Sequence, residues 1–278
     1  MPFFHAPDGL RLHFEDTGND APPVLCLAGL TRNVADFAHL PALLPEYRVI
    51  RLSTRGRGAS GHAADPATEY QVGVEAGDAL ALLDHLGISR VAVIGTSRGG
   101  ILGMLMHAMR PGLLSGLVLN DVGSKVEVAG LTRIAGYAGK QVKAPDFAEA
   151  ARRMQEVHAA DFPGVSEARW EAYARAIYDA DEDGRPVISY DPAIAEISLA
   201  GLAEAPPQID LSALWTPCAG LPVLALRGAN SDILSAETLA EMAGQEGCTT
   251  AVIPDRGHAP FLDEPEAAAA LRGFLPGL

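Results

Sequence analysis

Short, continuous apolar runs recur along the first half of the chain and again near its end. Each run is short enough for a strand rather than a helix, and most end at a glycine or a polar residue. Strands that helices cover on both faces have this pattern, so we predict buried parallel strands. The runs are VLCLAG (24–29), YRVIRLS (47–53), VAVIG (91–95), LSGLVLN (114–120), LPVLALRG (221–228) and TTAVIP (249–254).

Helical patterns alternate with these runs. One apolar face repeats at the spacing of a helix over Ala79, Leu82, Leu83 and Leu86. Residues 99–110 are apolar nearly all round, which predicts a buried helix that ends at Pro111, and a last helix is expected over 265–274. Strands that alternate with helices in this way are joined by right-handed crossovers. The pattern therefore predicts the α/β class, with a mostly parallel, doubly wound sheet.

The pattern changes between residues 123 and 217. This segment has helix-like stretches and no long strand, yet it holds eight of the sixteen aromatic residues. We therefore expect one α/β core, residues 1–122 and 218–278, interrupted by a helical cap over 123–217. Because such insertions can line a pocket, Trp170, Tyr173 and Tyr178 are candidate pocket residues.

Composition and charge narrow the range of functions. The chain has 278 residues and a net charge of −14, which disfavours a nucleic-acid or membrane partner. Its N-terminus is not typical of a signal peptide. The three cysteines are far apart and odd in number, which argues against a disulfide framework and favours a cytoplasmic location. No cofactor motif or metal-ligand cluster is apparent, so we expect neither a cofactor nor a metal.

The most informative motif is Gly95-Thr-Ser97-Arg-Gly99, which has the form G-x-S-x-G. It follows a predicted strand directly and opens a predicted buried helix. A serine on such a turn has a strained backbone, and flanking glycines supply the space that the turn needs. Ser97 is therefore a candidate nucleophile.

A serine hydroxyl needs a base, and the base needs an acid that orients it. His258 follows the last predicted strand, and loops beyond the carboxyl ends of strands face the site in open α/β sheets. Asp232 follows the run 221–228 and completes the chain order nucleophile, acid, base, so we predict that it is the acid. Asp121 ends the run 114–120 and is its rival.

Two backbone N–H groups should bind the oxyanion. The residue after the nucleophile is Arg98, and the loop after the run 24–29 offers Leu30. The Arg98 side chain has two possible roles, a contact to a substrate carboxylate in the pocket or a structural salt bridge.

These motifs together resemble the α/β-hydrolase fold superfamily, among its members with a helical cap. The resemblance implies the same roles for Ser97, Asp232 and His258. Three positions depart from the usual family pattern: Ala28 replaces the histidine of a His-Gly pair, Ser53 replaces an aspartate, and Arg98 replaces an apolar residue or glutamine. The matching pieces run nearly end to end and are LCLAGLTRN (25–33), TRGRGASG (54–61), VIGTSRGG (93–100), LVLNDVG (117–123), LRGANSD (226–232) and RGHAPFLDEP (256–265).

Three functions fit this pattern. The first is a cofactor-independent serine hydrolase that cleaves a small carboxylic ester or lactone through an acyl-enzyme. The second is hydrolysis of a carbon–carbon bond in a diketone ring-cleavage product, which a carboxylate contact from Arg98 would favour. The third is a non-catalytic receptor for a small ligand. Each of the three takes a small molecule into a pocket below the cap.

Overall fold

A single eight-stranded sheet forms the centre of the computed structural model, which describes residues 1–278. Its strand order is β1-β2-β4-β3-β5-β6-β11-β12; the pairings β1–β2 and β2–β4 are antiparallel and the other five are parallel. The predicted α/β class with a mostly parallel sheet is therefore confirmed. The strands are β1 (Phe3–His5), β2 (Arg11–Asp16), β3 (Pro23–Leu27), β4 (Arg48–Leu52), β5 (Val91–Thr96), β6 (Leu114–Asn120), β11 (Val223–Gly228) and β12 (Cys248–Ile253).

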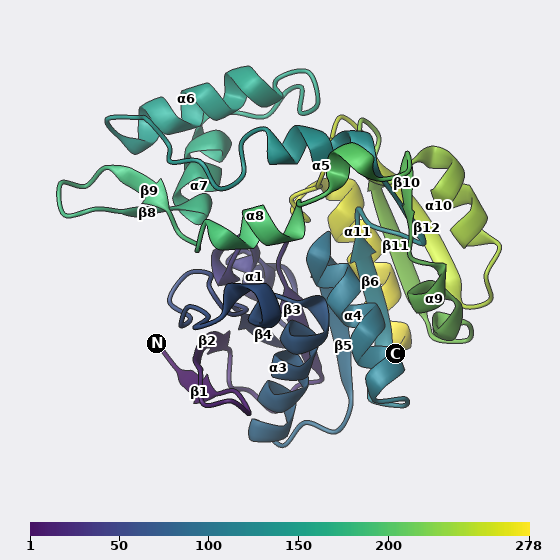
Figure 1. The fold of residues 1–278 in the computed structure, drawn as a ribbon. Helices are drawn as coiled ribbons and strands as arrows, with labels where there is room; N and C mark the ends of the chain where they lie inside the picture. The colour runs from purple at the N-terminus through teal and green to yellow at the C-terminus, as the bar shows by residue number, and fades with distance from the viewer.

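Helices cover both faces of this sheet (Figure 1). Residues of α3, α4 and α10 belong to one hydrophobic cluster, and residues of α1 and α11 belong to another. The helices of this layer are η1 (Val34–Phe37), α1 (Leu40–Leu43), α2 (Pro66–Glu69), α3 (Val72–His85), α4 (Arg98–Met109), α10 (Ala236–Ala243), α11 (Pro265–Phe274) and η4 (Leu275–Gly277).

The alternation of side chains along each strand builds these two clusters. On β5, Val91 and Val93 belong to the first cluster, whereas Ala92 and Ile94 belong to the second. Successive side chains of a strand point to opposite faces, so a strand covered on both sides must be apolar at every position. This is the physical reason for the continuous apolar runs in the sequence.

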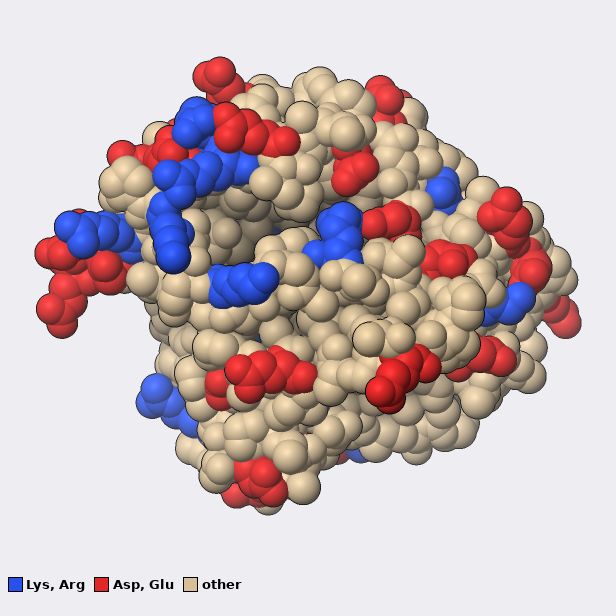
Figure 2. All heavy atoms as spheres, turned by 45° about the horizontal axis from the view of Figure 1, so that its top comes forward, with Lys and Arg blue, Asp and Glu red and all other residues tan.

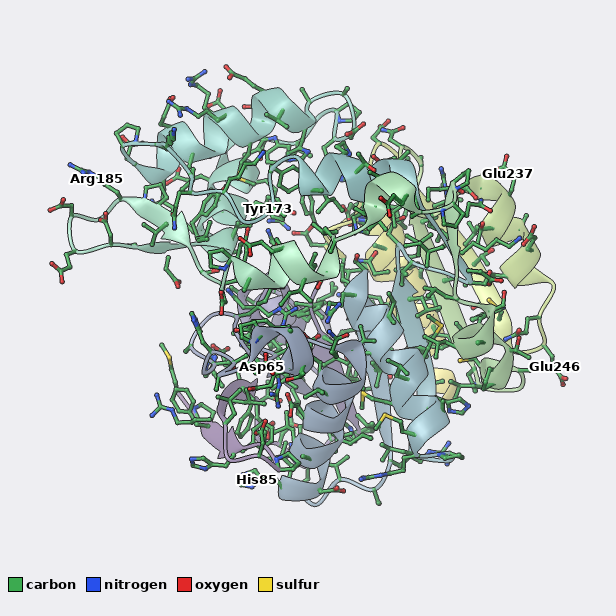
Figure 3. All side chains as sticks on the ribbon, in the orientation of Figure 1. Asp65, His85, Tyr173, Arg185, Glu237 and Glu246 are labelled. Carbon is green, nitrogen blue, oxygen red and sulfur yellow. The ribbon has the colours of Figure 1, made fainter.

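Most of residues 123–217 lie above the carboxyl ends of the parallel strands, whereas the last part of this segment lies beside the sheet (Figure 1). This segment has five α-helices, two 3-10 helices and two antiparallel strand pairs, β7–β10 and β8–β9. The β8–β9 hairpin projects away from the sheet with Arg185 at its tip (Figure 3). The elements are β7 (Lys125–Glu127), α5 (Val128–Ala135), α6 (Phe147–His158), α7 (Glu167–Ile177), β8 (Tyr178–Ala180), β9 (Pro186–Ile188), α8 (Ala193–Ser198), η2 (Leu202–Glu204), β10 (Gln208–Asp210), α9 (Ser212–Trp215) and η3 (Thr216–Cys218).

The segment packs in two ways. Its middle has a small cluster of its own around the buried Trp170, to which Phe261 of the last loop contributes. Its ends, by contrast, join the main cluster through Val126 and Trp215. The division into a core and a cap over 123–217 stays a prediction. Trp215, near the end of that segment, packs against the sheet layer. No helix combines the length and the apolar character that a membrane span requires.

Candidate active site

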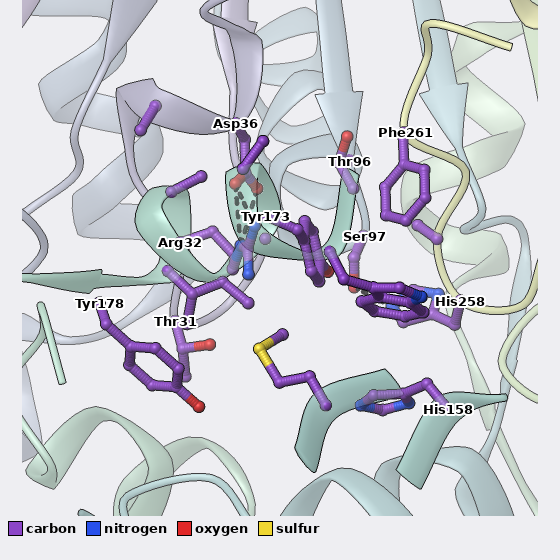
Figure 4. Close-up of a pocket in the computed structure, with 18 of the residues that line it drawn as sticks. Thr31, Arg32, Asp36, Thr96, Ser97, His158, Tyr173, Tyr178, His258 and Phe261 are labelled. Atoms are coloured by element: carbon purple, nitrogen blue, oxygen red, sulfur yellow. Dashed lines mark hydrogen bonds and ion pairs between the residues drawn. The ribbon is translucent and has the colours of Figure 1, made fainter. Parts of the chain in front are cut away.

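Ser97 occupies a strained turn between β5 and α4. Its φ and ψ are 53° and −118°, a conformation that few residues other than glycine adopt. The turn is held because the Ser97 N–H donates to the Asn120 carbonyl on the neighbouring strand β6, with an N···O distance of 2.9 Å. This geometry places the side chain at the base of the cavity (Figure 4).

The two glycines of the motif allow this turn to form. A Cβ atom on Gly95 would lie 2.4 Å from the backbone of Gly99, and a Cβ on Gly99 would lie 1.9 Å from the Leu27 carbonyl oxygen. No carbon atom fits at either distance. The start of α4 therefore packs directly against the backbone of β3 and β5.

His258 connects the serine to a carboxylate. Its Nε2 lies 2.9 Å from Ser97 Oγ, and its Nδ1 lies 2.7 Å from Asp121 Oδ2. A carboxylate only accepts, so Nδ1 donates and Nε2 is left to accept the serine proton. Ser97, His258 and Asp121 thus form one continuous hydrogen-bonded chain.

The prediction that Asp232 is the acid is wrong for this structure. The carboxylate of Asp232 accepts two hydrogen bonds from Arg133 on α5, at 2.6 and 2.7 Å, and its side chain is 38% exposed. Burial raises the pKa of Asp232, but the Arg133 guanidinium outweighs burial and holds that pKa below its usual range. This carboxylate is paired with Arg133 and makes no hydrogen bond to the imidazole of His258.

Asp121, the rival, is fully buried and fully paired. Its Oδ1 accepts from the Gly228 N–H at 2.9 Å, and its Oδ2 accepts from Ser231 Oγ at 2.5 Å as well as from His258. Asp121 directly follows β6, the strand that pairs with β5, and Ser97 directly follows β5. The end of β11 and the loop after it therefore donate hydrogen bonds to Asp121, and they do not provide the carboxylate that His258 contacts.

The loop that carries His258 is fixed from two sides. Asn120 donates to the Pro260 carbonyl at 2.9 Å and to Thr96 Oγ1 at 3.0 Å, which ties the loop to β5 and β6. The buried Glu264 accepts from the Phe261 N–H and from Arg256 Nε, each at 2.9 Å. These contacts hold the imidazole without a ligand.

Both predicted oxyanion amides are near the serine. Arg98 is the first residue of α4, where N–H groups have no intrahelical acceptor. The loop with Gly29 and Leu30 lies beside Ser97, since a Cβ on Gly29 would come within 3.8 Å of Ser97 Cβ, and the Leu30 N–H donates to no atom of the chain. Their binding of an oxyanion stays a prediction.

A buried ion-pair cluster supports both amides. Glu75 of α3 accepts from Arg57 Nη1 through one oxygen and from Arg98 Nε through the other, each at 2.7 Å. Arg57 in turn donates from Nε to the Leu30 carbonyl at 2.8 Å. Burial raises the pKa of Glu75, but its two guanidinium partners outweigh burial and leave that pKa below its usual range.

This cluster decides the role of the Arg98 side chain. The guanidinium also donates to the Tyr70 carbonyl at 3.1 Å, and the side chain is not among those that line the cavity. The prediction that it lines the substrate pocket is therefore wrong, and the salt-bridge alternative is correct. The Ser53 side chain has a structural role too, since its Oγ accepts from the Val34 N–H at 3.3 Å.

Ser97 and His258 open into a cavity of about 640 Å³ between the sheet and residues 134–190. Trp170, Tyr173 and Tyr178 line this cavity, and their contact with a substrate stays a prediction. Figure 4 shows Tyr173 beside Ser97 and Tyr178 farther from it. This volume suits a small organic ligand.

The sequence patterns singled out only part of the cavity lining. His39, His158 and Arg32 were not among the candidate residues, yet all three line the cavity. Burial lowers the pKa of His158, and the nearby Arg133 charge lowers it further, so its imidazole is neutral near pH 7. The position of Arg32 two residues after Leu30 was the one available signal.

The known proteins that this chain resembles are hydrolases. Residues 22–265 match the family model described as the alpha/beta hydrolase fold. The 3-hydroxybutyrate-oligomer hydrolase of Cupriavidus necator is 34% identical, with 98% of this chain and 95% of that protein covered. The 3-oxoadipate enol-lactonase 2 of Acinetobacter baylyi is 28% identical, with 65% of this chain and 74% of that protein covered.

A solved structure is also similar over the whole chain. The crystal structure of an alpha/beta hydrolase from Novosphingobium aromaticivorans has a TM-score of 0.92 and 42% sequence identity. The match between the two structures covers all of this chain and 98% of that protein. The segment over the sheet is therefore shared with that protein as well as the sheet itself.

Proposed function

The chain belongs to the alpha/beta hydrolase fold family, and from this premise we propose that it is a serine hydrolase that cleaves small carboxylic esters through an acyl-enzyme. One observation carries the proposal: Ser97, His258 and Asp121 form an unbroken hydrogen-bonded chain whose serine end lies in the cavity. A serine that shares its proton with an oriented imidazole is the arrangement that nucleophilic acyl transfer requires.

The chemistry follows from these positions. Nε2 of His258 takes the Ser97 proton as Oγ attacks the ester carbonyl, and the N–H groups of Leu30 and Arg98 stabilise the oxyanion. His258 then returns the proton to the departing alcohol, which leaves an acyl group on Ser97. Water attacks that ester by the same route and releases the acid. Asp121 stays ionised throughout and stabilises the imidazolium.

Ester hydrolysis is favoured over the other two functions. A carboxylate contact from Arg98 would have favoured the carbon–carbon bond alternative, but that guanidinium is bound to Glu75 and does not line the cavity. A receptor would bind the same small molecules with little or no turnover, so a measurement of turnover separates it from an enzyme. The name of the Cupriavidus relative points to esters of a short hydroxy acid as the first substrates to test, and that of the Acinetobacter relative points to a lactone.

A labelling experiment with a matched control tests the proposal. A fluorophosphonate probe should label the wild-type chain and Ser89→Ala, whose serine is exposed and remote in the turn before β5, but not Ser97→Ala. The kcat for 4-nitrophenyl butyrate should fall by about 10⁶ in Ser97→Ala and stay unchanged in Ser89→Ala. Equal labelling of all three proteins, or wild-type binding without turnover, would refute a serine hydrolase.

A further inference from the structure

The cavity gathers positive charge in a chain whose net charge is −14. Two carboxylates, Asp36 and Asp263, are among its lining residues. The cations that line it are Arg32, Lys140, Arg153 and Arg169. Figure 2 shows basic side chains gathered around the hollow on this face, although acidic residues outnumber basic ones in the whole chain.

Most of these cations are already neutralised by protein groups. Arg169 lies 3.0 Å from Asp263, and Arg153 donates to Glu149 at 2.7 Å. Lys140, one of only three lysines in the chain, lies at the exposed edge of the cavity and donates to a backbone carbonyl. Its charge has no carboxylate partner, so it can attract an anion without holding it in one orientation.

Arg32 is also paired, with Asp36, but one end of its guanidinium stays free at the cavity. Its Nε donates to both Asp36 oxygens at 2.9 and 3.0 Å, and its Nη2 donates to the same carboxylate. Nη1 donates to no protein atom and is not sealed within the protein. The side chain is only 11% exposed, and Figure 4 shows its guanidinium turned toward the cavity.

The surroundings of Arg32 fix its orientation and its charge. Its guanidinium carbon lies 4.4 Å from the centre of the Tyr173 ring, a cation–π contact. Burial lowers the pKa of Arg32, but the Asp36 carboxylate raises it by more, so the group stays cationic at any working pH. The pair with Asp36 therefore aims the free N–H group without removing the positive charge.

Arg32 also lies close to the reacting serine. A Cβ on Gly29 would lie 3.5 Å from Arg32 Cγ and 3.8 Å from Ser97 Cβ, so these two side-chain atoms are no farther apart than the sum of the two distances. A substrate that reaches both groups needs only a short link between its ester and an anionic end.

We propose that Arg32 is a specificity-determining residue that binds a carboxylate on the substrate, within a few bonds of the ester attacked by Ser97. This inference rests on the proposed ester hydrolysis and adds the substrate class, short esters with a free carboxylate. Arg32 Nη1 supplies a charge-assisted hydrogen bond to that carboxylate. Lys140 at the cavity edge raises the local concentration of such anions.

The test compares two substrates that differ only in charge, 3-(butanoyloxy)butanoate and its neutral carboxamide. Arg32→Gln removes the charge but keeps most of the side-chain stem. Arg110→Gln is the matched control, because Arg110 also pairs with an aspartate, Asp84, but at an exposed site outside the cavity. The kcat/KM of each protein is measured for both esters by release of butanoate.

We expect the wild-type chain and Arg110→Gln to favour the carboxylate ester. Arg32→Gln should lower kcat/KM for that ester by about 10- to 100-fold, mainly through KM, with little change for the carboxamide. An equal loss for both esters in Arg32→Gln would show a merely structural role and overturn the inference. Wild-type hydrolysis of both esters at equal rates would also overturn it but leave ester hydrolysis intact, whereas no hydrolysis of any ester would refute both proposals.

A measurement on the wild-type chain removes any dependence on the folding of the variant. With 4-nitrophenyl butyrate as reporter, 3-hydroxybutanoate should inhibit competitively and 3-hydroxybutanamide should inhibit at least tenfold more weakly. Equal inhibition by the acid and the amide would overturn the carboxylate site.

Discussion

Replacement of Asp121 by asparagine tests which carboxylate orients His258. The Gly228 N–H donates to Oδ1, so the amide oxygen of an asparagine would take that position. Its NH₂ group would then take the place of Oδ2 and face Nδ1 of His258. A donor opposite Nδ1 forces the imidazole proton onto Nε2, which can then no longer accept the proton of Ser97.

The expected loss is large because the tautomer, rather than the packing, is changed. Asparagine has the shape of aspartate, so the buried site stays filled, while the wrong tautomer in a serine–histidine pair lowers kcat by about 10⁴. Asp232→Asn is the control. Its side chain is 38% exposed and paired with Arg133, and exposed ion pairs contribute about 0–1 kcal/mol, so kcat should change by a few-fold at most.

The assay is kcat for 4-nitrophenyl butyrate in both variants, with thermal unfolding to confirm that each is folded. Fluorophosphonate labelling should slow in parallel with kcat in Asp121→Asn, because both reactions use the same serine and base. A folded Asp121→Asn with near-normal kcat, beside an inactive Asp232→Asn, would refute the assignment and restore the acid to the loop after β11.

Three other results are expected. Gly99→Ala should abolish folding or labelling, because its Cβ would lie 1.9 Å from the Leu27 carbonyl oxygen, and a soluble, fully active variant in a labelling assay would contradict this. Glu75→Gln should lower the free energy of unfolding in urea at pH 7. The pKa of Glu75 is lowered in the folded state, so its contribution to the free energy of unfolding is present above its ordinary pKa of about 4.3 and is lost as the pH falls further. The difference in that free energy between wild type and variant should therefore narrow in acid. A difference that is constant with pH would count against the ion pairs. EDTA should leave kcat unchanged, since a serine–histidine mechanism uses no metal, and loss of activity that zinc restores would reopen the assignment.

The sequence alone determined the features that depend on neighbouring residues. Apolar runs become buried strands because side chains alternate between two covered faces, and each of the six predicted runs is a strand of the sheet. The turn at Ser97 was readable for the same reason, because the glycines that allow its close contacts are two residues away on either side. His258 was placed by its position just after the last strand.

Only the tertiary structure decided between Asp121 and Asp232. Both follow strands whose carboxyl ends face the site, so position in the chain does not separate them. The choice depends on Arg133, 99 residues before Asp232, which draws that carboxylate toward α5 and leaves Asp121 to accept from His258.

The side chains of Arg98 and Arg32 show the same limit. Arg98 follows the nucleophile directly, yet Glu75 on α3 holds its guanidinium outside the cavity, while Arg32 enters the cavity because Asp36 and Tyr173 orient it. A long charged side chain can point in many directions from the same backbone position, and its partners come from elements far apart in the chain. Local pattern therefore determines the strands, helices and sharp turns, whereas the partners of each charge are determined by how those elements pack.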